Sequence, residues 1–266
     1  MNKFHDIVVY TALFGSYDTL GAVDPGWNCD FVCFTDNPDS IPEGWQIEFV
    51  PCNNESFATL NRRYKMLPHE YLGKYKRSLY IDANIKLIKD PTPLFNKYLN
   101  NGTIAIPMHP DRHCLYDEGL ACIEHGKADE ETVLQLLCRY KELGFPENFG
   151  LTENNVILRR HLDETVVSLM NEWWTEYCGG AKRDQLILPY LIWKNSIRLI
   201  YLREGPRISN RYFKIDLHNR DMKNSFMHRM IQRSIIDKNI SIYSFVIATV
   251  ALKLIYIKKV LFKWIG

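Results

Sequence analysis

The sequence of 266 residues has no Cys-x-x-Cys pair, and its 7 cysteines are an odd number. A small secreted domain held together by disulfides uses closely spaced cysteines in even sets, so this class is excluded and we expect reduced thiols. Residues 1–6 lead directly into an apolar segment, without the basic region, long apolar run and cleavage site of a secretory signal. We therefore expect a cytoplasmic protein.

Several motifs of nucleotide-binding and hydrolytic enzymes are also missing. No Gly-x-Gly-x-x-Gly follows the first apolar segment, and no Gly-Lys-Ser or Gly-Lys-Thr occurs, which argues against a Rossmann dinucleotide site and a P-loop. There is no nucleophile elbow to support a Ser-His-Asp hydrolase. Repeats and low-complexity tracts are absent, and the 46% hydrophobic and 24% charged residues are typical of a globular chain.

The net charge of +2 conceals two regions of opposite sign. Residues 201–266 contain 13 Lys and Arg against 4 Asp and Glu, whereas residues 1–200 contain 20 against 27. This split predicts a globular body, residues 1–220, and a basic tail, residues 221–266, with different partners. We expect no nucleic-acid partner for either.

Short β-branched and aromatic segments alternate with longer helical patterns, which predicts an α/β fold. Several of these segments are apolar at every position, as strands between two layers of helices are. The predicted strands are Ile7–Leu13, Phe31–Thr35, Ile47–Val50, Ser78–Ile81, Thr103–Ile106, Asn155–Leu158 and Ile197–Leu202.

Two predicted helices are marked by their ends. The first begins after Asp129, an N-capping residue, and is stopped by Gly144. The second runs from Asp163 to Tyr177, and its apolar residues, including Trp173 and Trp174, recur on one face. We expect that face to pack in the core, and a binding role for the aromatic residues is the alternative.

The tail has two segments of different character. From Asp221 to Asp237, apolar residues recur at helical spacing among Lys and Arg, which predicts an amphipathic helix. Ile240–Leu252 carries no charge, but these 13 residues fall short of the roughly 20 that span a bilayer. We favour helices in the interface at the cytoplasmic face of a membrane, with Lys253 and the later lysines meeting anionic headgroups. Packing on the body or on a partner chain, and a true span, are the alternatives.

One pair of polar side chains stands directly after a predicted buried strand. Asp82 and Asn84 follow Ser78–Ile81, and residues two apart in an extended chain point the same way. Their oxygens suit Mn²⁺ or Mg²⁺, which would grip a nucleotide diphosphate beyond the carboxyl end of the strand. An ordinary turn is the alternative interpretation.

Three neighbouring groups favour the nucleotide interpretation. A glycine permits close approach, an aromatic ring can stack on a base, and guanidinium and ammonium groups suit diphosphate oxygens. The candidates are Thr11, Phe14, Gly15 and Tyr17 after the first strand, Asp36 after the second, and Arg62, Arg63 and Lys65 before the Asp82 strand. Turn chemistry and a solvated helix face are the alternatives.

Two further clusters are rich in titratable residues. His109–Glu118 follows the Thr103 strand, and zinc binding by His109 and His113 is disfavoured because Pro110 interrupts a helix across them. Asp184 precedes an apolar segment and suits a helix N-terminus that carries an acid toward a cleft. Plain N-capping is the alternative for Asp184.

The order of these motifs resembles a glycosyltransferase-like domain family long catalogued as a domain of unknown function, with members in bacterial surface-polysaccharide loci and among plant mucilage and pectin-related proteins. The resemblance extends over residues 5–203. It is carried by Tyr10–Asp18, Phe34–Asp36, Arg62–Lys65, Tyr80–Asn84, His109–Glu118, Gly150–Asn155, Trp173–Trp174 and Asp184–Gln185.

This resemblance implies a GT-A-like fold, with a mixed, mostly parallel sheet between helices, that binds a nucleotide sugar. It implies that Asp82 and Asn84 occupy the place of a metal-binding Asp-x-Asp, and His218 is the candidate for the late histidine that completes the metal shell in similar transferases. Asn84 is a neutral ligand where many transferases have a carboxylate. A dispensable metal, with the nearby Arg and Lys residues neutralising the diphosphate, is therefore the alternative.

We expect a glycosyltransferase that moves a sugar from a nucleotide diphosphate donor to a glycan or lipid-linked acceptor in surface polysaccharide synthesis. The candidates for contacting the transferred sugar or the acceptor are His109, Arg112, Glu118, Glu153 and Asp184. Asp184 is the first candidate for a base in an inverting reaction and Glu118 the second, whereas a retaining reaction requires no base. A non-catalytic scaffold and a metal-dependent hydrolase are the rival functions.

Overall fold

The structure is a computed structural model that describes residues 5–265, without the side chains of residue 256 and residues 258–265. The predictions for residues 1–4 and for the side chains of Lys258, Lys259 and Lys263 lie outside the described residues.

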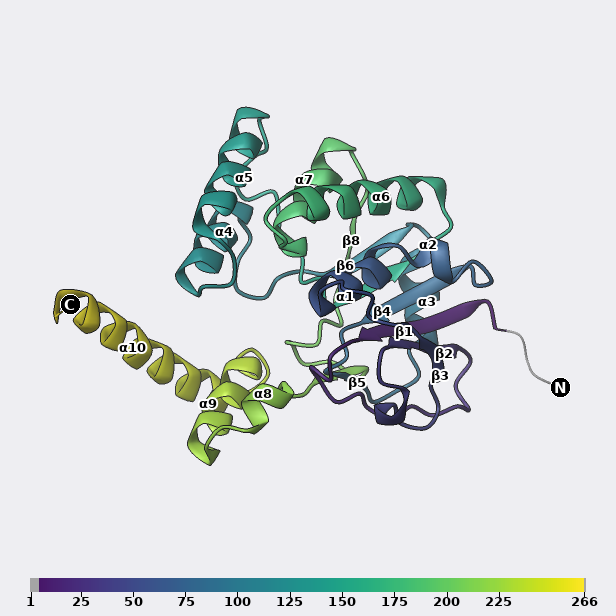
Figure 1. The fold of residues 1–266 in the computed structure, drawn as a ribbon, viewed down its shortest axis with the longest axis horizontal. Coiled ribbons are helices and arrows are strands. Elements are labelled where there is room, and N and C mark those ends of the chain that lie inside the picture. The colour runs from purple at the N-terminus through teal and green to yellow at the C-terminus, as the bar shows by residue number, and fades with distance from the viewer. Residues whose placement is uncertain (1–4, 266) are drawn as a thin grey trace.

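The body is built on a seven-stranded mixed sheet with the order β3-β2-β1-β4-β7-β6-β8. β7 pairs antiparallel with both of its neighbours, and the other pairs are parallel. The fold-class prediction, a mostly parallel sheet between helices, is therefore confirmed (Figure 1). The strands are β1 (Ile7–Leu13), β2 (Asp30–Thr35), β3 (Gln46–Phe49), β4 (Arg77–Ile81), β6 (Ile104–Pro107), β7 (Val156–Arg159) and β8 (Ile200–Leu202).

Helices cover both faces of this sheet. One face packs against α1 (Phe57–Met66), α6 (Glu164–Gly179) and α7 (Asp184–Lys194), and the other against α3 (Thr92–Leu99). β1 is buried at all seven positions because both of its faces are covered, whereas β3 at the edge is exposed at every position. The remaining helices of the body are α2 (Pro68–Tyr71), α4 (Leu115–Glu124), α5 (Glu130–Glu142) and the short η1 (Pro38–Ser40).

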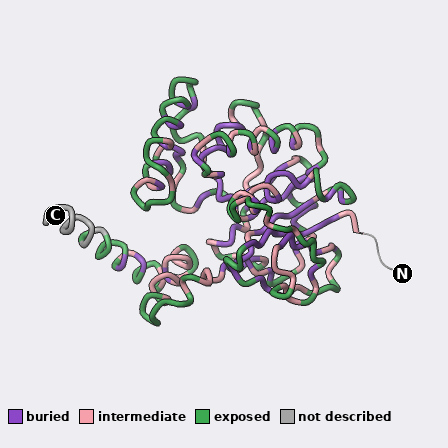
Figure 2. Tube along the Cα trace, viewed as in Figure 1, coloured by how far each residue is buried: buried purple, intermediate pink, exposed green. Residues whose placement is uncertain are grey.

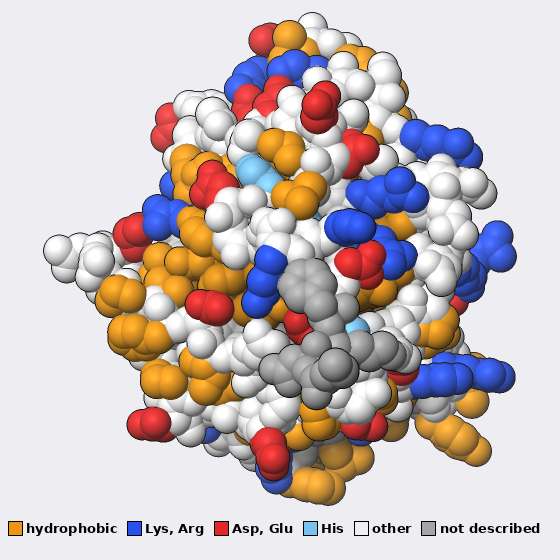
Figure 3. Space-filling view, turned by 90° about the vertical axis from the view of Figure 1, so that its right-hand side faces the viewer, with side chains coloured by type: hydrophobic (Ala, Val, Ile, Leu, Met, Phe, Trp, Pro, Cys, Tyr) orange, Lys and Arg blue, Asp and Glu red, His pale blue; other side chains and the backbone are white. Residues whose placement is uncertain are grey.

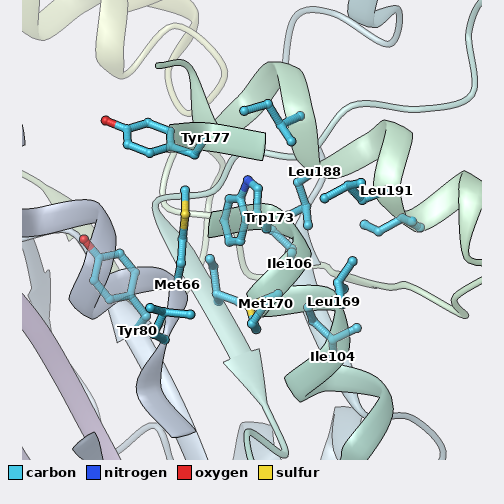
Figure 4. Packing of buried hydrophobic residues seen from close by; sticks show 14 of the residues in the cluster. Met66, Tyr80, Ile104, Ile106, Leu169, Met170, Trp173, Tyr177, Leu188 and Leu191 are labelled. Carbon is cyan, nitrogen blue, oxygen red and sulfur yellow. The ribbon is translucent and has the colours of Figure 1, made fainter. Parts of the chain in front are cut away.

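The predicted apolar face of α6 lies in the core, as Figure 4 shows for Met170, Trp173 and Tyr177. Asp163 caps the helix by accepting hydrogen bonds from the Thr165 and Val166 amides. The Trp173 indole donates to the main-chain oxygen of Asp184 at 3.0 Å. The core aromatic residue therefore fixes the start of α7.

A second, two-stranded sheet has no counterpart in the sequence predictions. β5 (Ile85–Leu87) pairs antiparallel with β9 (Phe213–Ile215). The pairing continues beyond β9, since the Asp216 amide donates to the Asn84 carbonyl at 2.8 Å. Chain segments far apart in sequence thus meet directly after β4.

The tail forms three helices, α8 (Asn219–Met222), α9 (Phe226–Ile236) and α10 (Ile242–Ile265). The prediction of one continuous helix from 221 to 237 is wrong, because the Ser225 side chain accepts from the His228 amide and starts a new helix. α9 is tied to the body by a hydrogen bond of 2.5 Å from Arg233 to the Ile215 carbonyl. Ile236 packs against the part of the core that lies between the sheet and α3. α10 extends away from the body (Figure 1).

Burial differs sharply between body and tail. Buried residues gather in the sheet and its covering helices, while α9 is mostly half-buried or exposed and the described part of α10 is largely exposed (Figure 2). Acidic, basic and apolar side chains are interspersed on the face of the molecule seen in Figure 3. Within the described residues, no helix combines the length and the apolar character needed to cross a membrane.

Candidate functional site

Loops from the carboxyl ends of β1, β2, β4, β6 and β8 meet at one edge of the large sheet. β7 runs the opposite way and starts there, so the Asp82 amide donates to the Asn155 carbonyl at 2.9 Å. In open α/β sheets this is the edge at which ligands bind. Most of the predicted site residues lie along it.

The largest cavity at this edge has a volume of about 440 Å³, and we refer to it as the outer cavity. Its walls come from the loop after β1, the start of α1, residues 82–84 and His218. Tyr17 and Phe57 are 52% and 50% exposed, and both line the cavity. Exposed rings beside a cavity are suited to stacking on a planar base.

The loop after β1 has the geometry that close approach requires. Gly15 has a φ of +63°, and a Cβ at this position would overlap the Phe57 ring. Its amide donates to the Asp36 carboxylate at 3.0 Å, so Asp36 holds the loop in place. Thr11 and Phe14 are buried beneath it.

A second space, the inner cavity of about 180 Å³, adjoins the outer one. The two share Arg62, Asp82, Asn84 and His218, so they form one cleft. The inner cavity is also lined by charged and amide side chains from distant elements, namely Lys65, Glu153, Asn154, Asn155, Arg183, Asp184, Gln185 and Arg207.

A buried cluster of opposite charges forms the floor of the cleft. Lys65, whose side chain is 2% exposed, places Nζ 2.7 Å from Asp184 Oδ2 and 3.8 Å from Asp82 Oδ1. Arg62 Nε lies 3.4 Å from the same Asp184 oxygen. The Tyr80 hydroxyl donates to Asp82 at 2.8 Å.

The cations determine the protonation of Asp184. Burial alone raises the pKa of a carboxyl group, but Arg62 and Lys65 outweigh it and hold the pKa of Asp184 well below its usual range. A carboxylate with a depressed pKa accepts a proton poorly. Asp184 is held between Arg62 and Lys65 in this structure, and its role as a base stays a prediction.

Asp82, Asn84 and His218 all line both the outer and the inner cavity, and metal binding by them stays a prediction. Asn84 donates its amide N–H to the Asp216 carbonyl at 3.1 Å, which leaves the amide oxygen for a cation. His218 Nδ1 lies 2.8 Å from Asp18, and this hydrogen bond raises the pKa of His218 despite burial. A carboxylate on one ring nitrogen commonly orients the other toward a metal.

Glu153 and His109 lie farther along the same edge. Glu153 pairs with Arg207, yet burial outweighs this ion pair and raises the pKa of the carboxyl group. His109 Nδ1 accepts hydrogen bonds from the amides of Asp111 and Arg112. Both residues line a further cavity beside the cleft.

Thr11 and Asp36 line neither the outer nor the inner cavity, and three further predicted residues form ion pairs away from both. Arg63 forms a two-bond ion pair with Glu55 at 2.6 and 2.8 Å and lines neither the outer nor the inner cavity. Arg112 and Glu118 pair with each other, and Glu118 is 2% exposed. The structure does not bring these side chains to the cleft.

Some residues of the cleft were missed by the sequence analysis. Arg207 lies in the loop after β8, and Phe57 and Asn61 lie on the first turns of α1. The only sequence signal for Arg207 as a cleft residue was its position as a basic residue after the last predicted strand. Nothing in the sequence pattern distinguished Phe57 or Asn61 from other residues of a helix surface.

The fold is an α/β domain of the glycosyltransferase-like type, with a cleft at the carboxyl edge of its sheet. The family model of the TOD1/MUCI70 glycosyltransferase-like domain matches residues 45–228. This match spans more than half of the chain, so the protein belongs to that family.

One curated relative is described as the probable hexosyltransferase MUCI70 of Arabidopsis thaliana. It is 26% identical over 216 residues, which cover 70% of this chain and 37% of the relative. The chain thus spans little more than a third of the length of that relative.

Solved glycosyltransferase structures align with much of the chain at low identity. The galactosyltransferase LgtC, in complex with donor and acceptor sugar analogs, aligns with a TM-score of 0.44 and 15% identity, covering 76% of this chain and 74% of LgtC. The bifunctional glycosyltransferase WbbM aligns with a TM-score of 0.48 and 11% identity, covering 90% of this chain and 45% of WbbM. Mouse xyloside xylosyltransferase 1 aligns with a TM-score of 0.41 and 10% identity, covering 74% and 84%.

Proposed function

We propose that the protein transfers a sugar from a nucleotide diphosphate donor to a hydroxyl group of a glycan or lipid-linked acceptor. The observation that carries this proposal is the joined cleft, in which an aromatic-walled cavity meets Asp82, Asn84 and His218 and then the buried Lys65. We assign the aromatic-walled cavity to the nucleoside, the Asp82 end to the diphosphate with its cation, and the inner cavity beyond it to the transferred sugar. Membership of a glycosyltransferase-like family supports the same assignment.

A divalent cation fits the Asp82 end of the cleft. Asp82 supplies a carboxylate that is 35% exposed, and Asn84 and His218 supply an amide oxygen and an imidazole. Within the described residues, no three His, Cys, Asp or Glu side chains form a metal-binding group. Mn²⁺ or Mg²⁺ would then need diphosphate oxygens to complete its shell, as such ions commonly do. When bound, it would neutralise charge that develops on the leaving diphosphate.

The chain's own residues have distinct tasks in this proposal. Tyr17 and Phe57 hold the nucleoside, and Arg62 directs positive charge toward the diphosphate. Asp184 keeps Arg62 and Lys65 in place, because a fixed arrangement of charge costs no reorganisation during reaction. Asp18 orients the His218 ring through Nδ1.

We further propose that the tail binds an anionic membrane surface. Exposed apolar residues lie around most of α10, including Ile242, Tyr243 and Phe245, rather than along one stripe. A helix that is apolar nearly all round needs cover over most of its circumference, which a lipid phase can supply. Residues 222–236 contain basic residues and no Asp or Glu, which complements anionic headgroups.

A turnover assay on the full chain tests the transferase proposal. Nucleotide diphosphate sugars are incubated with Mn²⁺ and a lipid and glycan acceptor mixture, and the products are identified by mass spectrometry. We expect a new glycoside and one nucleoside diphosphate, with turnover reduced about a hundredfold or more in Asp82→Ala. Asp39→Ala, an exposed aspartate outside the cleft, is the matched control.

Two results would contradict the proposal. Free sugar as the sole second product would indicate a hydrolase. Nucleotide binding without turnover of any donor would indicate a non-catalytic scaffold.

A further inference from the structure

A third cavity of about 210 Å³ lies beyond the ends of β6 and β8, and we refer to it as the side cavity. Glu153 and Arg207 line both the side cavity and the inner cavity, so the side cavity opens from the cleft. Its other walls are formed by Pro107, Met108, His109, Pro110, His113, Leu202, Gly205 and Ile208. The proposed donor assignment leaves this space without a ligand.

One wall of the side cavity is polar. His109 Nδ1 accepts two main-chain hydrogen bonds, from Asp111 at 3.1 Å and Arg112 at 3.0 Å, so in the neutral ring the proton is on Nε2. Burial lowers the pKa of His109 to about 4, which keeps the ring neutral near pH 7. The wall thus offers an imidazole donor, the Glu153 carboxylate and the Arg207 guanidinium.

Other parts of the wall are apolar. Pro107 and Leu202 come from the strand ends, and Ile208 and the 43% exposed Met108 also line the cavity. A pyranose ring has hydroxyl groups along its edge and C–H groups on its faces. A small cavity with a few polar groups on one side and apolar surface on the other is complementary to such a ring.

The side cavity is also tied to the tail. Asp111, in the loop that carries His109, pairs with Lys238 Nζ at 2.9 Å and lies 3.5 Å from the Asn239 amide. Residues 238 and 239 form the turn between α9 and α10. A membrane that binds the tail would therefore lie on the side of the molecule where this cavity is found.

We infer that the side cavity binds the terminal pyranose of a lipid-linked acceptor, with Glu153 and His109 holding its hydroxyl groups next to the donor sugar. This inference rests on the proposed transferase function. A soluble glycan presents the same ring, and the two sources differ in the apolar group attached to it.

Methyl-selective NMR on the full chain, with labelled Met and Ile methyl groups, tests the inference. Methyl and octyl hexopyranosides are titrated separately, the latter below their micelle concentration. We expect shifts of the Met108 and Ile208 methyl signals with both, and binding of octyl pyranosides about tenfold tighter or more because their chain meets apolar surface.

Two variants locate the binding. Ile208→Trp fills the side cavity and should abolish the pyranoside shifts of Met108, whereas Leu134→Trp, on the exposed face of α5, should leave them unchanged. If Ile208→Trp fails to fold, His109→Asn removes the Nε2 donor but keeps a side-chain acceptor for the loop amides. It should weaken pyranoside binding at least about tenfold.

The outcomes separate this inference from the proposed function. Nucleoside diphosphate binding, followed by thermal shift, should survive in Ile208→Trp, and its absence in the wild type would count against the donor proposal alone. Shifts confined to Ile215, which lines the inner cavity, or no shifts at all, would overturn the side cavity as a sugar site. Equal affinity for methyl and octyl pyranosides would overturn the lipid-linked assignment.

Discussion

In the cleft, Lys65 and Asp184 carry charges on side chains that are 2% and 8% exposed, whereas along α10 the apolar Ile242 and Tyr243 are 70% and 80% exposed. Both arrangements are unusual, because charged groups are seldom buried and apolar residues seldom form a large exposed patch. The buried charges have partners within the body. Among the α10 side chains that the structure describes, Ala248 and Ala251 are buried, and the helix contacts α9.

This difference indicates that the cleft and the tail are built for different surroundings. We propose that a charged ligand fills the polar cleft. For the tail, we propose that a membrane covers its exposed apolar surface. The following variants disturb one region and spare the other.

The largest expected effect comes from breaking the buried ion pair. Lys65→Met leaves the Asp184 carboxylate buried with one cation fewer, which should lower the free energy of unfolding by about 3–5 kcal/mol. Urea denaturation measures it. Lys97→Met, which removes an exposed pair with Glu204, should cost less than about 1 kcal/mol. A similar loss in both variants would contradict the distinction.

Acid should destabilise the body through two buried neutral histidines. Burial lowers the pKa of His109 and of His161 from 6.5 to about 4. Between these values the unfolded chain binds protons that the folded chain does not, so stability falls as the pH drops from 6.5 to 4. Each histidine should contribute about 3 kcal/mol to this loss.

Urea denaturation between pH 7 and pH 4 measures the histidine effect. His109→Asn should make the pH dependence shallower by the contribution of one histidine. The exposed His113, replaced in the same way, is the control. An unchanged slope in His109→Asn would refute the assignment.

For the tail, removal of two positive charges should weaken membrane binding. Lys223→Gln with Arg229→Gln should reduce the affinity for vesicles containing anionic lipid by about 2 kcal/mol. Flotation with anionic and with neutral vesicles measures it. Lys76→Gln with Lys141→Gln removes two exposed charges from the body, and an equal reduction there would argue against a tail-specific surface.

The smallest effect is expected at the contact between the two regions. Asp111→Asn removes the partly exposed pair with Lys238 and should cost less than about 1 kcal/mol. Amide hydrogen exchange of residues 109–113 should become faster, because the loop loses its tie to the tail. Unchanged exchange at these residues, or faster exchange over the whole body, would show that the Asp111–Lys238 pair does not hold this loop to the tail.

The sequence allowed all seven strands of the large sheet to be predicted, because runs such as Ile7–Leu13 are apolar on both faces. β5 and β9 were missed because each has three residues, and their pairing joins segments more than a hundred residues apart. That pairing brings His218 beside Asn84. The candidate histidine was therefore identified by resemblance alone.

The cations of α1 were only partly predictable. Arg62 and Lys65 are three residues apart and share one face of the helix, whereas Arg63 is rotated by about 100° from Arg62 and meets Glu55. Helical spacing alone favoured the first two. The pairing of Arg112 with Glu118 depends on the course of a loop, which no local pattern specifies.

The central claim is that the cleft binds a nucleoside diphosphate through a cation at Asp82. Isothermal calorimetry with UDP, GDP, ADP and CDP, with and without Mn²⁺, on the wild type and Asp82→Ala tests it most directly. We expect that one nucleotide binds, that Mn²⁺ strengthens the binding, and that Asp82→Ala abolishes the effect of Mn²⁺. Binding of no nucleotide, or Mn²⁺-dependent binding that persists in Asp82→Ala, would contradict it.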